Sequence, residues 1–296
     1  MKTMLRKARV PHIGGARARK NGTALDPAKE MRLNLALVAQ MTREIGPQIH
    51  ALSAADAARL DGSAGRDLLR ARSLLESASA SFAKLGEARV ADNARKLARM
   101  DKPWKVNLGS GGHRLSGWIN IDVAGGDVDQ CMQWGLPFPD RSVQFVFFAH
   151  ALEHLYFKDE AAAVLSEIHR VLAPRGVARI VVPDVGRFLH AYAQKNEPFF
   201  SRRREIWPSE RDCRTPLEQI LSSSGASTPP YAFLCHKWGY DFETLGSLLG
   251  DVGFRRVERS AFMKSRHRAL RVDDRSHAGS VQFREEPYSL FVEARR

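Results

Sequence analysis

The sequence predicts an α/β protein with a doubly wound, mainly parallel sheet, preceded by a helical extension. From about residue 104 onward, short apolar runs that favour strands alternate with amphipathic helical runs, which is typical of a parallel sheet covered on both faces. A glycine-rich turn follows the first apolar run, and a carboxylate ends the second. Residues 26–100 are instead rich in Ala, Leu, Arg, Lys and Glu, and therefore predict helices.

The expected elements succeed one another as in a doubly wound fold. The boundary to the extension is placed at residues 101–103, because proline disfavours helix in the preceding residue. Strands are expected at 105–108, 119–123, 128–132, 144–149, 177–182, 254–260 and 280–294, and helices at 67–83, 159–172 and 242–249. In such a sheet, ligands bind beyond the carboxyl ends of the strands, where the strand order reverses.

The turn within residues 105–112, KVNLGSGG, indicates a site for a nucleoside-containing cofactor. Glycine accepts positive φ and has no Cβ, so a ligand can approach the bare backbone. Asp122, at the end of the next strand, offers acceptors for a ribose diol. A dinucleotide site needs a third glycine three positions after the second and an acid roughly 20 positions further on. Here Arg114 stands at that position and the acid comes too early, which disfavours NAD and FAD.

Further motifs follow the glycine turn in order. The whole series reads NLGSG at 107–111, GWINID at 117–122, LPFPD at 136–140, LEH at 152–154, EIHRVL at 167–172, PD at 183–184 and SLFVEA at 289–294. In these motifs the chain resembles the class I S-adenosylmethionine (SAM) dependent methyltransferases, specifically the type 11-like bacterial group often associated with polysaccharide biosynthesis. The resemblance covers about residues 104–296. It implies a Rossmann-like, seven-stranded sheet with antiparallel sixth and seventh strands, and SAM as the cofactor.

The resemblance also implies which residues bind SAM. They lie at the carboxyl ends of the first four strands: Asn107, Gly109, Ser110, Gly111, Asp122, Asp129 and Ala149. Backbone N–H groups of residues 109–111 are expected to hold the methionine carboxylate. Asp122 is expected to accept the ribose hydroxyls, and Asp129 to bind the adenine amino group. Asn107 stands where many related enzymes carry a carboxylate.

The segment from His150 to His154 allows more than one interpretation. His-x-x-Glu-His is also the inverted zinc-protease motif, but here it directly follows a buried strand within the methyltransferase series, so no metal is expected. Glu153 and His154 either orient the loop or take part in catalysis. A weak hydroxyl nucleophile needs a base, and imidazole titrates near neutrality. His150 is the first candidate for that base, followed by His154 and then His236.

Acceptor specificity is expected in residues 196–238, an irregular insertion between strands five and six that resembles a lid. Aromatic residues alternate there with Arg202, Arg203 and Arg204, and residues 222–230, SSSGASTPP, favour a flexible stretch. Aromatic faces and arginines suit a sugar, a phosphate-bearing glycan or a nucleotide equally well.

Composition bounds the class of protein. The 296 residues, 44 % of them hydrophobic, suffice for one large domain and an appendage. The three cysteines are odd in number and widely spaced, which disfavours a disulfide framework and a zinc knuckle and fits a cytoplasmic protein. No apolar run reaches the roughly 20 residues of a membrane span, and residues 1–24 do not resemble a secretory signal.

Most of the formal charge of +13 lies in residues 1–103, where basic residues are twice as numerous as acidic ones. Residues 1–24 are interpreted as a solvated basic tail or an arm that contacts a polyanion. One helix containing Leu33 and Leu37 is expected to end near Gly46. The apolar stripes of residues 25–103 need a partner: the catalytic domain, each other, or a second copy in a homo-oligomer.

The sequence thus predicts direct methyl transfer to an acceptor, with O-methylation of a saccharide or glycan intermediate as the first hypothesis. An RNA methyltransferase that uses the basic extension is the second, although no RNA-binding signature is present. A non-catalytic SAM-binding scaffold protein is the third.

Overall fold

A computed structural model describes residues 59, 63–207, 210–224, 236–275 and 288–296. Seven strands form one sheet in the order β3-β2-β1-β4-β5-β7-β6. Their bounds are β1 Trp104–Leu108, β2 Ile119–Asp122, β3 Val128–Asp129, β4 Val143–Ala149, β5 Leu172–Pro183, β6 Arg256–Arg259 and β7 Ser289–Arg295. The first five strands pair in parallel, and β7 is antiparallel to both β5 and β6. The expected Rossmann-like sheet with seven strands is confirmed.

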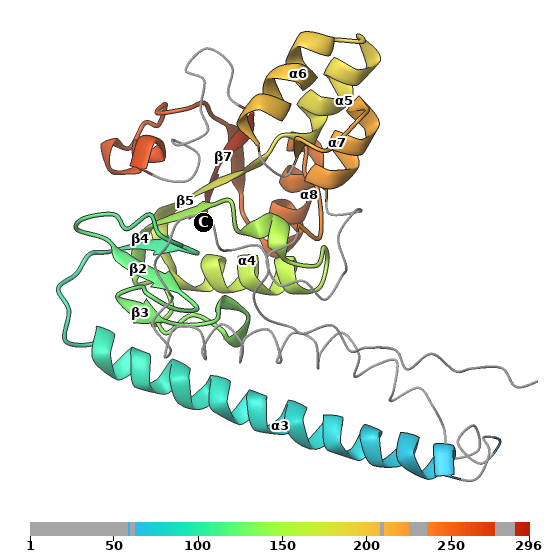
Figure 1. The fold of residues 1–296 in the computed structure, drawn as a ribbon. Coiled ribbons are helices and arrows are strands. Elements are labelled where there is room, and N and C mark those ends of the chain that lie inside the picture. Colours follow the sequence, from blue (N-terminus) through green and yellow to red (C-terminus); the bar gives the residue numbers. More distant parts are fainter. Residues whose placement is uncertain (1–58, 60–62, 208–209, 225–235, 276–287) are drawn as a thin grey trace, which may run out of the picture.

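The helices lie around this sheet and at one end of it (Figure 1). Their bounds are α3 Ser63–Leu97, α4 Glu160–Val171, α5 Val185–Ala193, α6 Glu197–Ile206, α7 Pro216–Ser223 and α8 Phe242–Val252, with short 3-10 turns η1 Met132–Trp134, η2 Leu152–His154, η4 Arg268–Leu270 and η5 Asp273–Arg275. Helices α5, α6 and α7 gather beyond β5 and β7. No helix in the described ranges is long and apolar enough to span a bilayer.

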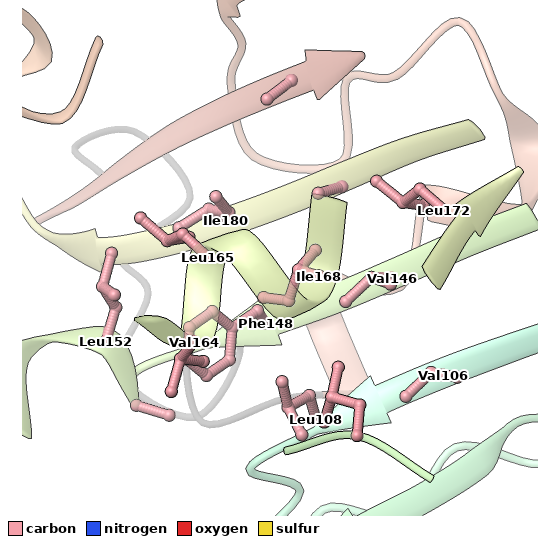
Figure 2. Packing of buried hydrophobic residues seen from close by; sticks show 14 of the residues in the cluster. Val106, Leu108, Val146, Phe148, Leu152, Val164, Leu165, Ile168, Leu172 and Ile180 are labelled. Carbon is pink, nitrogen blue, oxygen red and sulfur yellow. The ribbon is translucent and has the colours of Figure 1, made fainter. Parts of the chain in front are cut away.

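The core forms where α4 covers the parallel strands. The buried residues of α4, from Ala161 to Val171, recur every three or four positions and therefore share one face. Figure 2 shows Val164, Leu165 and Ile168 of this face packed toward the strands. Burial of this stripe against β1, β4 and β5 fixes the parallel sheet, and so fixes the strand ends that carry the site.

The helical extension packs on the sheet domain through the C-terminal half of α3. A Cβ at Gly86 would lie 2.8 Å from Cγ of Trp134 in η1, so only glycine allows this approach. Further along, Nδ2 of Asn93 donates to the backbone oxygen of Asp129 at 3.1 Å and to Oε1 of Gln130 at 2.8 Å. The rest of α3 projects away from the sheet (Figure 1).

The structure differs from the expected elements in several places. The helix expected at 67–83 continues to Leu97. Good helix formers run on to that residue, and no proline and no exposed glycine interrupts them. Residues 196–238 were expected to be irregular, yet they contain α6 and α7, each started by a side chain that caps its first turn. The helix expected around residues 33–46 lies outside the described residues.

Arg179 of β5 joins the end of the sheet to the segment between β6 and β7. Its fully buried guanidinium donates to both oxygens of Asp273 at 2.8 and 2.7 Å and to Glu293 of β7 at 2.8 Å. It also donates to the carbonyl of Ala261 at 2.7 Å. One cation therefore satisfies two buried carboxylates.

Replacing Arg179 with methionine is expected to destabilise the protein by about 3–5 kcal/mol, because it leaves two buried carboxylates without their cation. Chemical denaturation measures this change. The matched control is Arg256→Met, which removes an exposed ion pair with Glu258 and is expected to cost less than about 1 kcal/mol. Equal stability of the two variants would show that the buried network contributes little.

Candidate active site

One cavity of about 490 Å³ lies at the carboxyl ends of β1, β4 and β5. Its floor is formed by the loop that follows β1, and its far side by residues of α6, α7 and the segment before α8. This volume lies within the range of small-molecule sites. Five of the seven residues expected to bind the cofactor line it, as do all three candidate bases: Asn107, Gly109, Ser110, Gly111, Ala149, His150, His154 and His236.

The loop after β1 needs glycine for two different reasons. Gly109 has φ +65°, and a Cβ there would lie 2.7 Å from Cβ of Ala151. Gly111 has φ +53°, but a Cβ there would meet nothing within 4 Å. Gly109 is therefore required by the protein itself, whereas Gly111 leaves bare backbone beside open space that a ligand can approach.

Two N–H groups of this loop are used inside the protein. Ser110 N–H donates to the backbone oxygen of Ile121 at 3.0 Å, and Gly111 N–H donates to Oδ2 of Asp122 at 2.8 Å. Both N–H groups were expected to hold the methionine carboxylate, and in this structure they bond within the protein instead. Ser110 Oγ, in contrast, is buried without a hydrogen-bond partner among the described residues, which makes it a donor that a ligand can satisfy.

Asp122 and Asp129 lie outside the set of residues that line the cavity. The Asp122 carboxylate supports the glycine loop through Gly111 and also accepts from Val123 N–H at 2.8 Å. Oδ1 of Asp129 accepts from Gly125 N–H at 2.7 Å and Gly126 N–H at 3.3 Å. These bonds stabilise a tight turn and favour a structural role for Asp129.

Asn107 is also engaged within the protein. Its Nδ2 donates to the carbonyl of His113 and to Oδ1 of Asn120, both at 2.9 Å. Asn120 in turn bonds to both backbone groups of Leu115. The two asparagines therefore hold the loop between β1 and β2 in shape through their side-chain amides.

His150 occupies a strained and enclosed position at the end of β4. Its φ of +52° is uncommon for a residue with a side chain. Nδ1 lies 3.2 Å from Oε1 of Glu153, and Nε2 lies 3.0 Å from Oγ of Ser289. Because both ring nitrogens are engaged and the side chain is 8 % exposed, the geometry favours a positioning role over that of a base.

Glu153 is the residue around which the three histidines gather. Its backbone oxygen accepts from Lys237 N–H at 2.6 Å and Trp238 N–H at 3.3 Å, which brings His236 to the cavity. The rings of His154 and His236 meet edge to face at 4.9 Å. Burial alone would raise the pKa of Glu153, but the hydrogen bond from His150 and electrostatic interaction with the three histidines lower the pKa to about 2. Glu153 is therefore ionised at neutral pH.

The far side of the cavity is built by a buried ion pair. Glu210 accepts from Arg203 Nε at 3.0 Å, from Gln219 at 2.9 Å and from Ser223 at 2.9 Å. The guanidinium of Arg203 also stacks on Phe188, 4.0 Å from the ring centroid. Arg203 is the only lysine or arginine among the described lining residues, and Glu210 neutralises it. This side of the cavity is therefore polar but without net charge.

Several lining residues were not singled out individually from the sequence, although those between 196 and 238 belong to the segment expected to set acceptor specificity. Arg203, Trp207, Glu210, Ser223, Tyr288 and Ser289 all line the cavity. Arg203 was expected only as one of three arginines in an insertion, and Ser289 only as part of the last strand. Arg203 and Glu210 are seven positions apart, and α6 ends between them. Their pairing could be predicted from the sequence only if the end of α6 were known.

Part of the chain is similar to known methyltransferases. Residues 90–180 match the type 11 family model described as a methyltransferase domain. No curated protein matches the chain. Three solved structures of SAM-dependent methyltransferases are similar to the chain. The one from Methanosarcina mazei is 16 % identical, with 67 % of this chain and 93 % of that chain covered and a TM-score of 0.37. The one from Archaeoglobus fulgidus is 16 % identical, with 71 % and 94 % covered and a TM-score of 0.36. The one from Mesorhizobium loti is 15 % identical, with 69 % and 96 % covered and a TM-score of 0.34.

The methyltransferase domain matched at residues 90–180, the sheet order and the position of the cavity support a SAM-dependent methyltransferase. This domain implies SAM as the cofactor, and the residues present fit this molecule. Open space lies above Gly111, and Ser110 Oγ offers a donor that has no partner among the described residues.

Replacing Asp122 with alanine is expected to weaken SAM binding by at least roughly 100-fold. The variant loses the ribose acceptors and the bond that holds Gly111, and hydrogen bonds to charged groups contribute about 1.5–3 kcal/mol each. Isothermal titration calorimetry with SAM measures the effect. Asp140→Ala, in an exposed loop, is the control with unchanged affinity. An Asp122→Ala variant that binds SAM like the wild type would contradict the ribose assignment.

Proposed function

We propose that this protein transfers the methyl group of SAM to a hydroxyl of an uncharged polar acceptor, with saccharides and glycan intermediates as the first class to test. The observation that carries the proposal is the meeting of three features in one cavity: the glycine loop, a cluster of histidines around Glu153, and a polar side without net charge. The known association of type 11-like enzymes with polysaccharides supports the choice of acceptor only by analogy.

Bound SAM supplies an electrophilic methyl group, and its transfer is an in-line displacement that depends mainly on alignment of the acceptor. The chain contributes alignment through the walls of the cavity. Phe157 stacks on Trp238 with ring centroids 4.6 Å apart and an interplanar angle of 6°, which fixes the segment that carries His236. A hydroxyl must also lose its proton to a group within reach.

His236 is better suited to accept that proton than His150. Nδ1 of His236 lies 2.5 Å from the carbonyl oxygen of Ser223. A carbonyl only accepts hydrogen bonds, so Nδ1 carries the hydrogen and Nε2 is the basic nitrogen of the neutral ring. The His236 side chain is 27 % exposed, so an acceptor can reach it. His154, whose ring contacts that of His236, is the second candidate.

Methylation of RNA is the alternative that the basic extension favours. Residues 1–103 carry most of the positive charge of the chain, and positive charge attracts phosphates. The described lining of the cavity, however, offers no lysine or arginine that is not already neutralised. The basic extension thus argues for a polyanion near the protein, and the cavity argues for an acceptor without phosphate.

A panel of acceptors tests the proposal. The purified protein is incubated with SAM and, separately, with neutral saccharides, phosphorylated saccharides and RNA, and release of S-adenosylhomocysteine is measured. The expected result is turnover with neutral saccharides. Turnover with RNA alone, lost at high salt, would favour the alternative, and no turnover with any acceptor would favour a scaffold protein.

His236→Ala is expected to lower kcat by about 10²–10⁴-fold, the usual contribution of a general base, while the affinity for SAM stays unchanged. Steady-state kinetics on the best acceptor and calorimetry with SAM measure the two effects. His190→Ala is the matched control, since His190 lies exposed on α5. Retained turnover in His236→Ala would exclude this side chain from proton transfer.

A further inference from the structure

The side chain of Glu153 lies among imidazoles that come from two segments of the chain. His154 is its neighbour in η2, and His236 precedes α8. Ligand atoms of Glu153, His154 and His236 all lie within 4.8 Å of one another. Two imidazoles and one carboxylate form the donor set of many catalytic zinc sites and of the facial triad of iron enzymes.

The hydrogen bonds around this set leave two electron-pair donors close together. Because Nδ1 of His236 donates to the carbonyl of Ser223, Nε2 is the ring nitrogen that is left toward Glu153. That Nε2 lies 4.0 Å from Oε1 of Glu153. A metal cation between the two atoms would have both as ligands.

Glu153 adds a second and independent observation. Its side chain is 1 % exposed, and Oε2 has no hydrogen-bond partner among the described residues. Oε1 already receives the hydrogen bond from His150. A buried carboxylate oxygen without a partner is unfavourable, and buried carboxylates in proteins are usually paired or coordinate a metal.

We propose that Glu153, His154 and His236 bind one divalent transition-metal ion, with zinc as the first ion to test. Metal–ligand bonds of about 2.0–2.2 Å place the ligand atoms of a tetrahedral site roughly 3.4 Å apart, so the two imidazoles approach the carboxylate by side-chain rotation. His150 holds the carboxylate in place through a hydrogen bond to Oε1. This ion replaces the earlier expectation of a site without metal.

The three ligands leave a coordination position for an acceptor oxygen, because the cavity borders all of them. A hydroxyl bound there becomes more acidic, and its proton passes to water while the electron pair stays on the oxygen. Coordination occupies Nε2 of His236, so this nitrogen acts as a ligand when the metal is bound and as a base when it is not. The role in hydroxyl activation rests on the proposed function, whereas metal binding does not.

Metal binding is tested on the full-length, untagged protein after treatment with a chelator, without SAM or acceptor. Zinc content after reloading is measured by elemental mass spectrometry, and Co²⁺ affinity by visible absorption. The variants are Glu153→Gln, which keeps the shape of the side chain, and His236→Ala at the cavity wall. His190→Ala, which removes an exposed histidine elsewhere, is the control. SAM affinity of each variant reports on folding.

The expected result is one equivalent of zinc in the wild type and in His190→Ala, with Co²⁺ affinity at least roughly 100-fold weaker in Glu153→Gln and His236→Ala. No binding of either ion by the wild type at micromolar concentration, or equal binding by all variants, would overturn the proposal. Metal binding without methyl transfer would retain this site and reject the proposed function. Methyl transfer by protein that binds neither ion would reject this metal site and retain the proposed function.

Discussion

The arrangement of the cavity depends on Glu153 more than on any other residue. Its backbone carbonyl accepts the N–H groups of Lys237 and Trp238, and its side chain accepts a hydrogen bond from His150. Ser289 holds the other side of the His150 ring. The end of β4, the segment before α8 and the start of β7 therefore meet at one buried, ionised carboxylate. Such a group must be surrounded by cations and donors, and this requirement draws the histidines together.

The strands of the sheet were largely predictable because each buried strand is a continuous apolar run. β1, β2 and β4 begin and end within one residue of their expected bounds. β5 begins five residues earlier than expected, at Leu172, although Pro174, Arg175 and Gly176 disfavour a strand. Its start is set by pairing of Leu172 with Val143 of β4. Such a contact between distant residues has no signal in the local sequence.

The missed helices were predictable in principle. Thr215 and Glu218 form the pattern of a capping box, and Asn196 caps a helix with a proline in its first turn. The glycine loop and the cluster of histidines were recognised because their residues are close together in sequence. Which groups pair with each other was not predictable. The bond between His150 and Ser289 joins residues 139 positions apart, and the bond from Gly111 to Asp122 depends on how two strand ends align.

The position of β7 has a consequence for the growing chain. β7 is made after β6 yet lies between β6 and β5, and it pairs with β5 over seven residues. Until β7 leaves the ribosome, the apolar edge of β5 has no neighbour on that side, and an open apolar edge readily pairs with other chains. This exposure ends when Phe291 and Val292 of β7 pair with β5.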